Sequence, residues 1–120
     1  MTEVPFIYLA GKYTEPHTYL VQRNIALAQE YAQEIAIMGA LPVTPHLLTA
    51  NMDGIQHYQW WCDVTMQLLR KCDAVFMLPN YERSNGAIAE LVDALRIGMP
   101  VFYQLNEVKD WLSQTSLQSV

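Results

Sequence analysis

The 120-residue chain has little of what several classes of protein require. It contains only two cysteines, Cys62 and Cys72, which form no C-x-x-C pair and no cluster with histidine. We therefore expect neither a disulfide framework nor a zinc site, but two free thiols in apolar surroundings. Seven basic residues are scattered among twelve acidic ones, for a formal net charge of −5. This balance excludes a protein that grips a nucleic acid polymer through its phosphates.

Long apolar runs and glycine-rich motifs are missing as well. No segment approaches the roughly 20 apolar residues of a membrane span. The first residues lack the basic stretch and the apolar run of a signal peptide. The five glycines form neither a G-x-G-x-x-G motif nor a phosphate-binding P-loop. We therefore expect a cytoplasmic protein that has no membrane contact and needs no metal and no cofactor.

What the chain does have indicates one well-packed domain. About half of its residues (52%) are hydrophobic and 16% are charged, as in globular proteins. The length suffices for one hydrophobic core and is too short for two. No repeat, linker or low-complexity stretch divides the sequence, so we expect a single domain over residues 1–120.

Short apolar runs alternate with longer segments of helical periodicity. The runs that read as strands cover residues 6–10, 41–43, 74–78 and 101–103. The expected helices cover residues 18–38, 58–71 and 85–97, with a last helix beginning near residue 106. This order predicts an α/β fold with a doubly wound parallel sheet of four to five strands, helices on both faces, and residues 6–10 beside residues 74–78.

Ligands of such sheets bind beyond the carboxyl ends of the strands. The loops over residues 11–16, 44–58 and 79–86 are therefore the candidates for a site. The helix over residues 85–97 is expected to pack through its large apolar side chains, which are Ile88, Leu91, Val92 and Leu95. Its opposite side carries Glu90 among small residues, which leaves room for a ligand.

The strongest local feature is the segment from Ser84 to Glu90, which follows a buried strand and opens a helix. Ser84 or Asn85 can cap the helix, and Gly86 lets a ligand approach the backbone. The free amides at a helix N-terminus suit an anion or a polar sugar edge. Glu90 lies one turn further and faces the same crevice. The alternative is that Glu90 is simply a solvated residue of the helix surface.

Two aspartates also lie near strand ends. Asp63 is in the first turns of the helix over residues 58–71, close to the ligand edge of the sheet, where it either acts on a ligand or stabilises the helix dipole. Asp73 opens a strand at the opposite edge, so we expect a structural role for it.

The first loop offers Gly11, Lys12 and Tyr13 directly after a buried strand. Gly11 permits close backbone approach, Lys12 can meet a phosphate, and Tyr13 can hydrogen-bond or stack. His46 lies just past the second strand. Each of these side chains has the alternative of being a solvated or structurally satisfied residue.

Together these segments resemble the nucleoside 2-deoxyribosyltransferase superfamily over most of the chain. The opening strand and its glycine are similar at residues 7–11, and a helix carrying an aspartate, here Asp63, precedes the next strand. The nucleophile motif of the superfamily is similar to Ser84-x-Gly86-x-x-x-Glu90.

The resemblance implies a role for each candidate residue. Glu90 would attack the anomeric carbon of a nucleoside and form a covalent glycosyl-enzyme. Asp63 would contact and help protonate the leaving base, and Tyr13 would orient Glu90. The residues expected to bind substrate are Gly11, Lys12, His46, Ser84, Asn85 and Gly86.

One departure from the superfamily bears on the substrate. Typical members carry aspartate where this chain has Ser84, whereas the branch that acts on deoxynucleoside 5′-monophosphates has a serine there that contacts the phosphate. This favours a nucleotide over a nucleoside. Pro45 and His46 are similar to a phage and bacterial branch whose function is largely unassigned.

Superfamily active sites are usually completed by a neighbouring subunit. Tyr58, Trp60 and Trp61 near the expected mouth form apolar surface that a second copy can cover. We therefore expect a homo-oligomer, a dimer or larger, that binds a nucleoside or nucleotide.

Two other functions remain open from the sequence. The chain can be a non-catalytic module that binds a nucleotide in the same crevice, or a structural or inhibitory partner protein. A buried, ordered Glu90 favours the enzyme, whereas a fully solvated one favours the alternatives.

Overall fold

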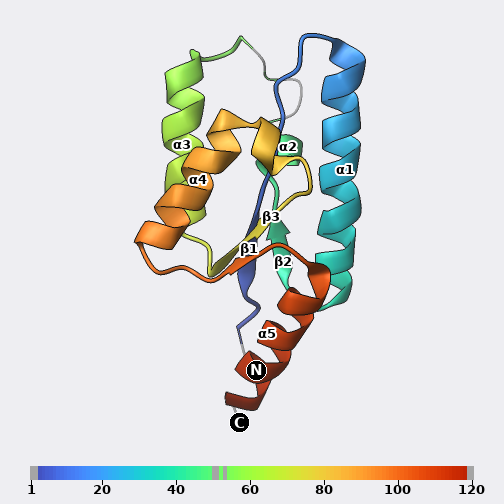
Figure 1. The fold of residues 1–120 in the computed structure, drawn as a ribbon, viewed down its shortest axis with the longest axis vertical. Coiled ribbons are helices and arrows are strands. Elements are labelled where there is room, and N and C mark those ends of the chain that lie inside the picture. Colours follow the sequence, from blue (N-terminus) through green and yellow to red (C-terminus); the bar gives the residue numbers. More distant parts are fainter. Residues whose placement is uncertain (1–2, 50–51, 53, 119–120) are drawn as a thin grey trace.

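A computed structural model gives the fold and describes residues 3–49, 52 and 54–118 (Figure 1). The strands are β1 (Phe6–Ala10), β2 (Leu41–Val43), β3 (Ala74–Met77) and β4 (Val101–Phe102). The helices are α1 (Thr18–Ile37), α2 (Pro45–Leu48), α3 (Tyr58–Arg70), α4 (Asn85–Arg96) and α5 (Leu105–Gln118), with a 3-10 turn η1 (Tyr81–Arg83). These bounds lie within a few residues of those expected from the sequence.

The strands form one parallel sheet in the order β2-β1-β3-β4. β1 and β3 are neighbours, with Ile7 opposite Ala74 and Ala10 opposite Met77, as the sequence predicts. The chain moves outward from β1 to β2 and then crosses back to β3, so the strand order reverses between β1 and β3. A crevice for a ligand is expected beyond the carboxyl ends of these two strands.

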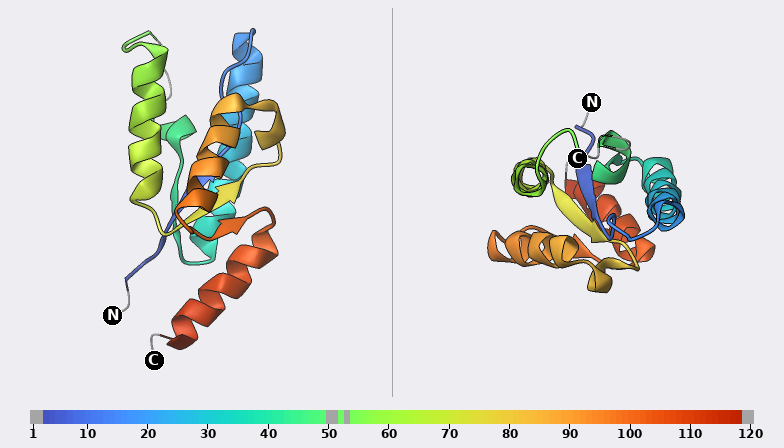
Figure 2. Two further views of the ribbon diagram at one scale, coloured as in Figure 1. Left: turned by 60° about the vertical axis from the view of Figure 1, so that its left-hand side comes forward. Right: turned by 90° about the horizontal axis from the view of Figure 1, so that it is seen from above.

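Helices lie on both faces of the sheet (Figure 2), and alternate residues of the central strands face two separate cores. Ile7 and Leu9 of β1 pack with α1 and α5, whereas Tyr8 and Ala10 pack with α3 and α4. All four of these side chains are at most 1% exposed. Both faces of the sheet are therefore covered, which explains why the central strands are continuously apolar.

Helix α4 packs through the side opposite to the one expected. Ala87 and Ala94 are buried against the sheet, whereas Ile88, Val92 and Leu95 are 38%, 58% and 58% exposed. The small side chains let α4 lie close to the strands, and this close approach turns the larger residues outward. Of the four large residues expected on the packing face, Leu91 packs against the core on this face of the sheet and the other three do not, because helical periodicity does not by itself tell which side of a helix is covered.

An ion pair between Arg70 and Asp93 joins α3 to α4 near their C-terminal ends, and Arg96 of α4 pairs with the same carboxylate. The nearly buried carboxylate of Asp93 accepts hydrogen bonds from Arg70 Nε at 2.8 Å and from Arg96. The Arg70 guanidinium, followed by Arg96, holds the pKa of Asp93 down at about 2. Asp73 has the expected structural role, because it accepts a hydrogen bond from Phe6 N at 2.7 Å.

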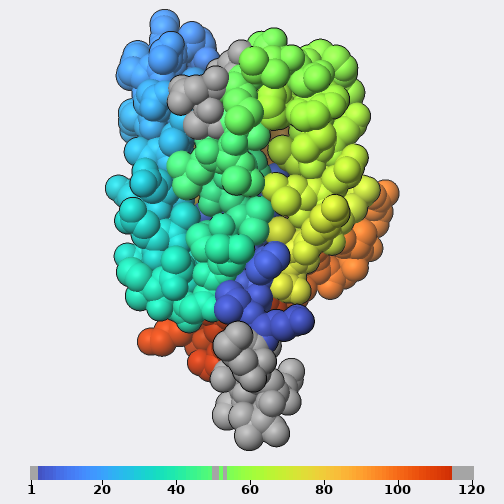
Figure 3. All heavy atoms as spheres, turned by 180° about the vertical axis from the view of Figure 1, so that it is seen from behind, coloured from blue at the N-terminus to red at the C-terminus, as the bar shows by residue number. Residues whose placement is uncertain are grey.

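The segment after β2 is more ordered than a loop, since α2 begins directly at Pro45. Proline suits the first position of a helix because its missing N–H needs no partner there. Residues 50, 51 and 53 of the expected loop lie outside the described part of the chain. Seen from behind, β2 and α2 lie between α1 and α3 (Figure 3). Within the described residues, no helix is both long and apolar enough to cross a membrane.

Candidate active site

Glu90 contacts the sheet at the central strand β1. It projects from the middle of α4, and its Oε2 accepts a hydrogen bond from the hydroxyl of Tyr8, which is 1% exposed. Tyr8 is fixed by the strand on both sides, because β1 pairs with β2 and β3. A side chain on a strand with paired neighbours thus sets the position of the glutamate.

Burial changes the acidity of both partners. Desolvation raises the pKa of Glu90 to about 7, although the hydrogen bond from Tyr8 favours the charged form and lowers it. Burial, followed by the neighbouring Glu90 charge, raises the pKa of Tyr8 well above its ordinary value. Tyr8 is therefore a permanent hydrogen-bond donor at neutral pH, and Glu90 is an acid poised to gain or lose a proton there.

Helix α3 supplies the other wall of this cluster. Thr65 favours the ionised form of the Tyr8 phenol and so lowers its pKa, while its own hydroxyl donates to the carbonyl of Cys62 at 3.2 Å. One turn earlier, Cys62 raises the pKa of Tyr58, followed by burial and then by the charge of Glu90. The side of α3 that meets Glu90 is therefore formed by Tyr58, Cys62 and Thr65.

Asp63 lies outside this cluster. It is exposed, and its Oδ1 accepts a hydrogen bond from Gln59 Nε2 at 2.9 Å. Asp63 precedes Arg70 by about two helical turns on the same side of α3. Arg70 bonds to Asp93 of α4, so this side of α3 faces α4. The structure thus places Asp63 on the exposed surface of α3, outside the Tyr8–Glu90 cluster.

The N-terminus of α4 forms the next part of the site. Ser84 caps the helix, as its Oγ accepts a hydrogen bond from Ala87 N at 3.1 Å. Its own O–H remains able to donate to an anion. A Cβ added at Gly86 would meet only Ser84 Oγ, at 3.8 Å, so the space beside this residue is open. Asn85 is exposed at the first turn.

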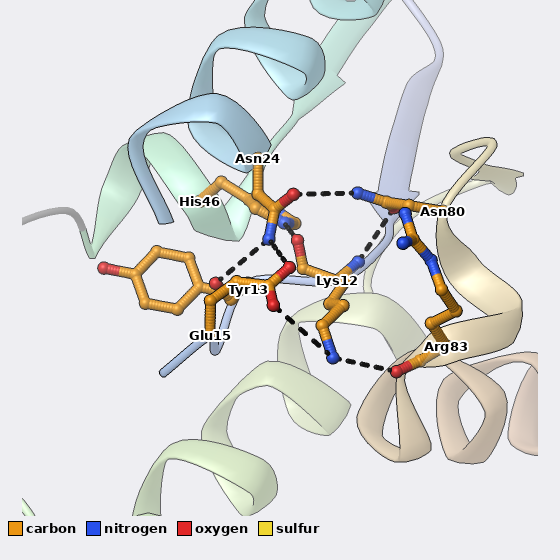
Figure 4. Close-up of polar contacts among 7 residues, drawn as sticks. All are labelled: Lys12, Tyr13, Glu15, Asn24, His46, Asn80 and Arg83. Atoms are coloured by element: carbon orange, nitrogen blue, oxygen red, sulfur yellow. Dashed lines mark hydrogen bonds and ion pairs between the residues drawn. The ribbon is translucent and has the colours of Figure 1, made fainter. Parts of the chain in front are cut away.

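Gly11 and Lys12 are fixed by the loop after β3. A Cβ at Gly11 would lie within 2.7–2.8 Å of the side chains of Leu78 and Asn80, so this glycine is required for packing. Lys12 N donates to Asn80 Oδ1 at 3.0 Å (Figure 4). Lys12 Nζ donates to the carbonyl of Arg83 at 3.1 Å, which puts the ammonium directly before the N-terminus of α4.

We expected Tyr13 to contact Glu90, but in the structure Tyr8 makes this contact. Tyr13 instead lies against His46, with ring centroids 5.6 Å apart, and its carbonyl accepts from Asn24 Nδ2 (Figure 4). The reason is positional, because Tyr13 follows the end of β1 whereas Tyr8 lies within it and faces α4.

His46 holds the loop after β1. It is 4% exposed, and its Nε2 lies 2.9 Å from the carbonyl of Lys12, which requires a proton on this nitrogen. Burial lowers the pKa of His46, so the ring is neutral at pH 7. Its role in the structure is to position Lys12.

Sequence reasoning missed three polar side chains of this region, namely Tyr8, Asn24 and Asn80. Each had a signal in the sequence. A tyrosine within a continuous apolar strand carries a hydroxyl that must find a partner once it is buried. Asn24 interrupts the apolar stripe of α1, and Asn80 closes β3.

The cysteines are free, as predicted. Cys72 is buried and Cys62 is half-buried. Burial, followed by the charge of Asp73, raises the pKa of Cys72 to about 11, so this thiol stays protonated. Within the described part of the chain, no group of three or more His, Cys, Asp or Glu side chains is arranged to hold a metal ion.

These features define a small parallel α/β fold with an acidic residue at its switch point. A 2-deoxyribosyltransferase from the psychrotolerant bacterium Bacillus psychrosaccharolyticus is similar, with a TM-score of 0.59 and 16% sequence identity over 80% of this chain and 69% of that one. The fold is therefore that of a 2-deoxyribosyltransferase, which confirms the resemblance at the level of the fold.

The family of the chain follows from its sequence. Residues 5–103 match the family described as Domain of unknown function (DUF4406), and the chain belongs to it. No curated protein sequence matches the chain.

The raised pKa of Glu90 predicts a pH-dependent cost in stability. The folded protein binds this proton more tightly than the unfolded chain, whose carboxyl has the ordinary pKa of 4.5, so stability falls as the pH rises from about 4.5 to about 7. Glu90→Gln keeps an acceptor for Tyr8 and does not titrate. We expect the variant to gain on the order of 2–3 kcal/mol over the wild type at pH 8, and much less at pH 5.

Urea unfolding at both pH values measures this difference. Glu34→Gln, at an exposed position of α1, is the matched control and is expected to show no such gain. An equal effect of the two substitutions at pH 8 would mean that Glu90 is not held in a desolvated site.

Proposed function

We propose that this protein cleaves or transfers the N-glycosidic bond of a nucleoside or nucleoside 5′-monophosphate, with Glu90 as the nucleophile. The observation that carries the proposal is the Glu90 carboxyl, desolvated on α4 and hydrogen-bonded by the buried Tyr8 at the switch point of the sheet. Such a desolvated carboxyl has little stabilising role, so its place in the fold needs a functional reason. The fold shared with a 2-deoxyribosyltransferase supports the same chemistry.

The reaction has two steps. In the first, a carboxylate oxygen of Glu90 forms a bond to the anomeric carbon, and the bond from that carbon to the base nitrogen breaks. The electron pair of the broken bond stays on the base, which takes up a proton. In the second, the acceptor attacks the anomeric carbon and releases Glu90 as the carboxylate, giving hydrolysis with water and transfer with a second base.

Tyr8 acts as a positioning residue in this mechanism. Its hydroxyl donates to one oxygen of Glu90 and leaves the other free to attack. Since the bond favours the carboxylate form, it also counters the effect of burial on the pKa. This is the role that the resemblance had assigned to Tyr13.

Asp63 is the proposed source of the proton for the leaving base. Its exposed place on α3 fits a base that leaves toward solvent, above a sugar held near Glu90. Gln59 holds the carboxylate in place from one turn away.

A phosphate on the substrate fits the N-terminus of α4. Ser84, the open space beside Gly86 and the ammonium of Lys12 lie next to one another there. A helix N-terminus and a nearby ammonium both favour an anion. We therefore place the 5′-phosphate in this corner, with the exposed Asn85 beside it.

The exposed apolar stripe of α4 favours a homo-oligomer. Ile88, Val92 and Leu95 follow one another on one side of the helix, and each is more than a third exposed. Exposed Tyr58 and Trp60 lie on the neighbouring α3. A second copy of this chain is the proposed cover for this surface, beside the groove that contains Glu90.

The second candidate function is nucleotide binding without catalysis. The observation in its favour is the exposed position of Asp63, which lies outside the Glu90 cluster. Turnover distinguishes the two functions, since both require the same crevice.

The first prediction from the proposal concerns turnover. Incubation with a panel of nucleosides and 5′-monophosphates should release free base, fastest from a monophosphate. Glu90→Gln keeps shape and hydrogen bonding but has no nucleophilic charge, so the rate should fall by about a thousandfold or more, on the order of 4 kcal/mol of transition-state stabilisation. Ligand affinity should change little. Chromatography of the released base measures the rate, and calorimetry measures the affinity.

The exposed Glu34→Gln again serves as control and should retain the wild-type rate. Base release by purified Glu90→Gln at the wild-type rate would reject the enzyme. Binding of a monophosphate without turnover by either protein would establish the non-catalytic alternative.

The second prediction concerns assembly. A charge in the middle of the α4 stripe should prevent a second copy from packing there, so Val92→Glu should be a monomer at tens of micromolar, where the wild type is at least a dimer. Light scattering gives the mass of both. A monomeric wild type, or a Val92→Glu variant with unchanged mass, would contradict this interface.

A further inference from the structure

A hollow of about 310 Å³ lies between α1 and the loop that contains η1. Its lining includes Arg23 and Asn24 of α1 together with Asn80 and Arg83. Glu90 is absent from the lining, because it belongs to the core on the other face of the sheet. The hollow is therefore separate from the candidate active site, although both lie at the same edge of the sheet.

The charges around this hollow are unbalanced. Arg23 and Arg83 are two of only seven basic residues in a chain of net charge −5. Neither forms an ion pair with any described residue. Glu30 also lines the hollow, but two guanidinium groups against one carboxylate leave a positive excess. Two unpaired positive charges around one space favour an anion between them.

The floor of the hollow carries oriented amide groups. Asn24 and Asn80 are both 7% exposed, and Asn80 Nδ2 donates to Asn24 Oδ1 at 3.3 Å. An amide nitrogen carries two N–H groups, so Asn80 keeps a second donor beyond this bond. The side chain of Arg83 runs from its backbone toward Asn80 (Figure 4).

We propose that this hollow binds the phosphate group of a small molecule through Arg23 and Arg83. Guanidinium groups form paired hydrogen bonds with phosphate oxygens, and two of them can hold one phosphate from both sides. The volume is at the lower end of the range for small-molecule sites and suits inorganic phosphate or a phosphate monoester. This site does not depend on the glycosidase activity proposed above.

The hollow is linked to the active site through the side chains of Asn80 and Asn24. Asn80 lines the hollow, and its Oδ1 accepts the hydrogen bond from Lys12 N. Asn24, its partner, donates to the carbonyl of Tyr13 at 3.3 Å and to Glu15 at 2.9 Å. A phosphate bound against these amides restrains the loop that holds Lys12.

Titration followed by ¹⁵N–¹H spectra tests the site directly. Inorganic phosphate and a nucleoside 5′-monophosphate are added separately to Glu90→Gln protein, so that no turnover occurs. We expect the side-chain amide signals of Asn24 and Asn80 to shift with both ligands. Arg23→Gln combined with Arg83→Gln should weaken phosphate binding at that site by about tenfold or more. Shifts with phosphate alone would identify the free ion as the ligand, and shifts with the monoester as well would identify the shared phosphate group.

Lys109→Gln, an exposed position of α5, removes a positive charge away from the hollow and is expected to leave binding unchanged. Both arginines are exposed, so the double variant should fold, which its unchanged signals outside the hollow will verify. Equal affinity of the double variant and the control would overturn the proposal, as would shifts confined to Ser84, Gly86 and Lys12. Those shifts would still be compatible with the active site proposed above.

Discussion

The hydrogen bond between Tyr8 and Glu90 is the constraint on which the site depends. It joins the central strand to α4 inside a core that is otherwise apolar, made of alanine, valine, leucine and methionine side chains. A carboxylate in an apolar core needs a hydrogen-bond donor, and Tyr8 is a donor whose position the strand fixes. The small residues Ala87 and Ala94 follow from the same arrangement, because they bring α4 close enough to the sheet for the contact to form.

Glu90, which this contact holds in place, is itself a destabilising group at neutral pH. Burial raises the pKa of Glu90 to about 7, so the charged form costs free energy at neutral pH. The ion pair between Arg70 and Asp93 joins α3 and α4 near their other ends and holds the two helices together. The stabilising ion pair thus lies away from Glu90, and the unfavourable burial of a charge is confined to the Glu90 site.

Most of the fold could be predicted from the sequence, since continuous apolar runs such as residues 74–78 and stop signals such as Gly39 and Gly98 act locally. Both glycines have positive φ, a conformation that glycine adopts without strain directly after a helix. The candidate site was predicted less completely. Glu90 and Ser84 could be proposed together from the sequence because they belong to one helix and its N-cap, whereas Tyr8 is distant in sequence and its partner depends on tertiary packing. The outward side of α4 was missed for the same reason.

The most direct test of the central claim is to trap the covalent intermediate. A nucleoside or 5′-monophosphate with fluorine at the 2′ carbon should form the glycosyl-enzyme and release it slowly, because fluorine destabilises the positive charge that develops on the sugar. Mass spectrometry of the intact protein, followed by peptide mapping, locates the added sugar. The account predicts one adduct on the peptide that contains Glu90, and none in Glu90→Gln. An adduct on a different residue, or an equal adduct in Glu90→Gln, would contradict it.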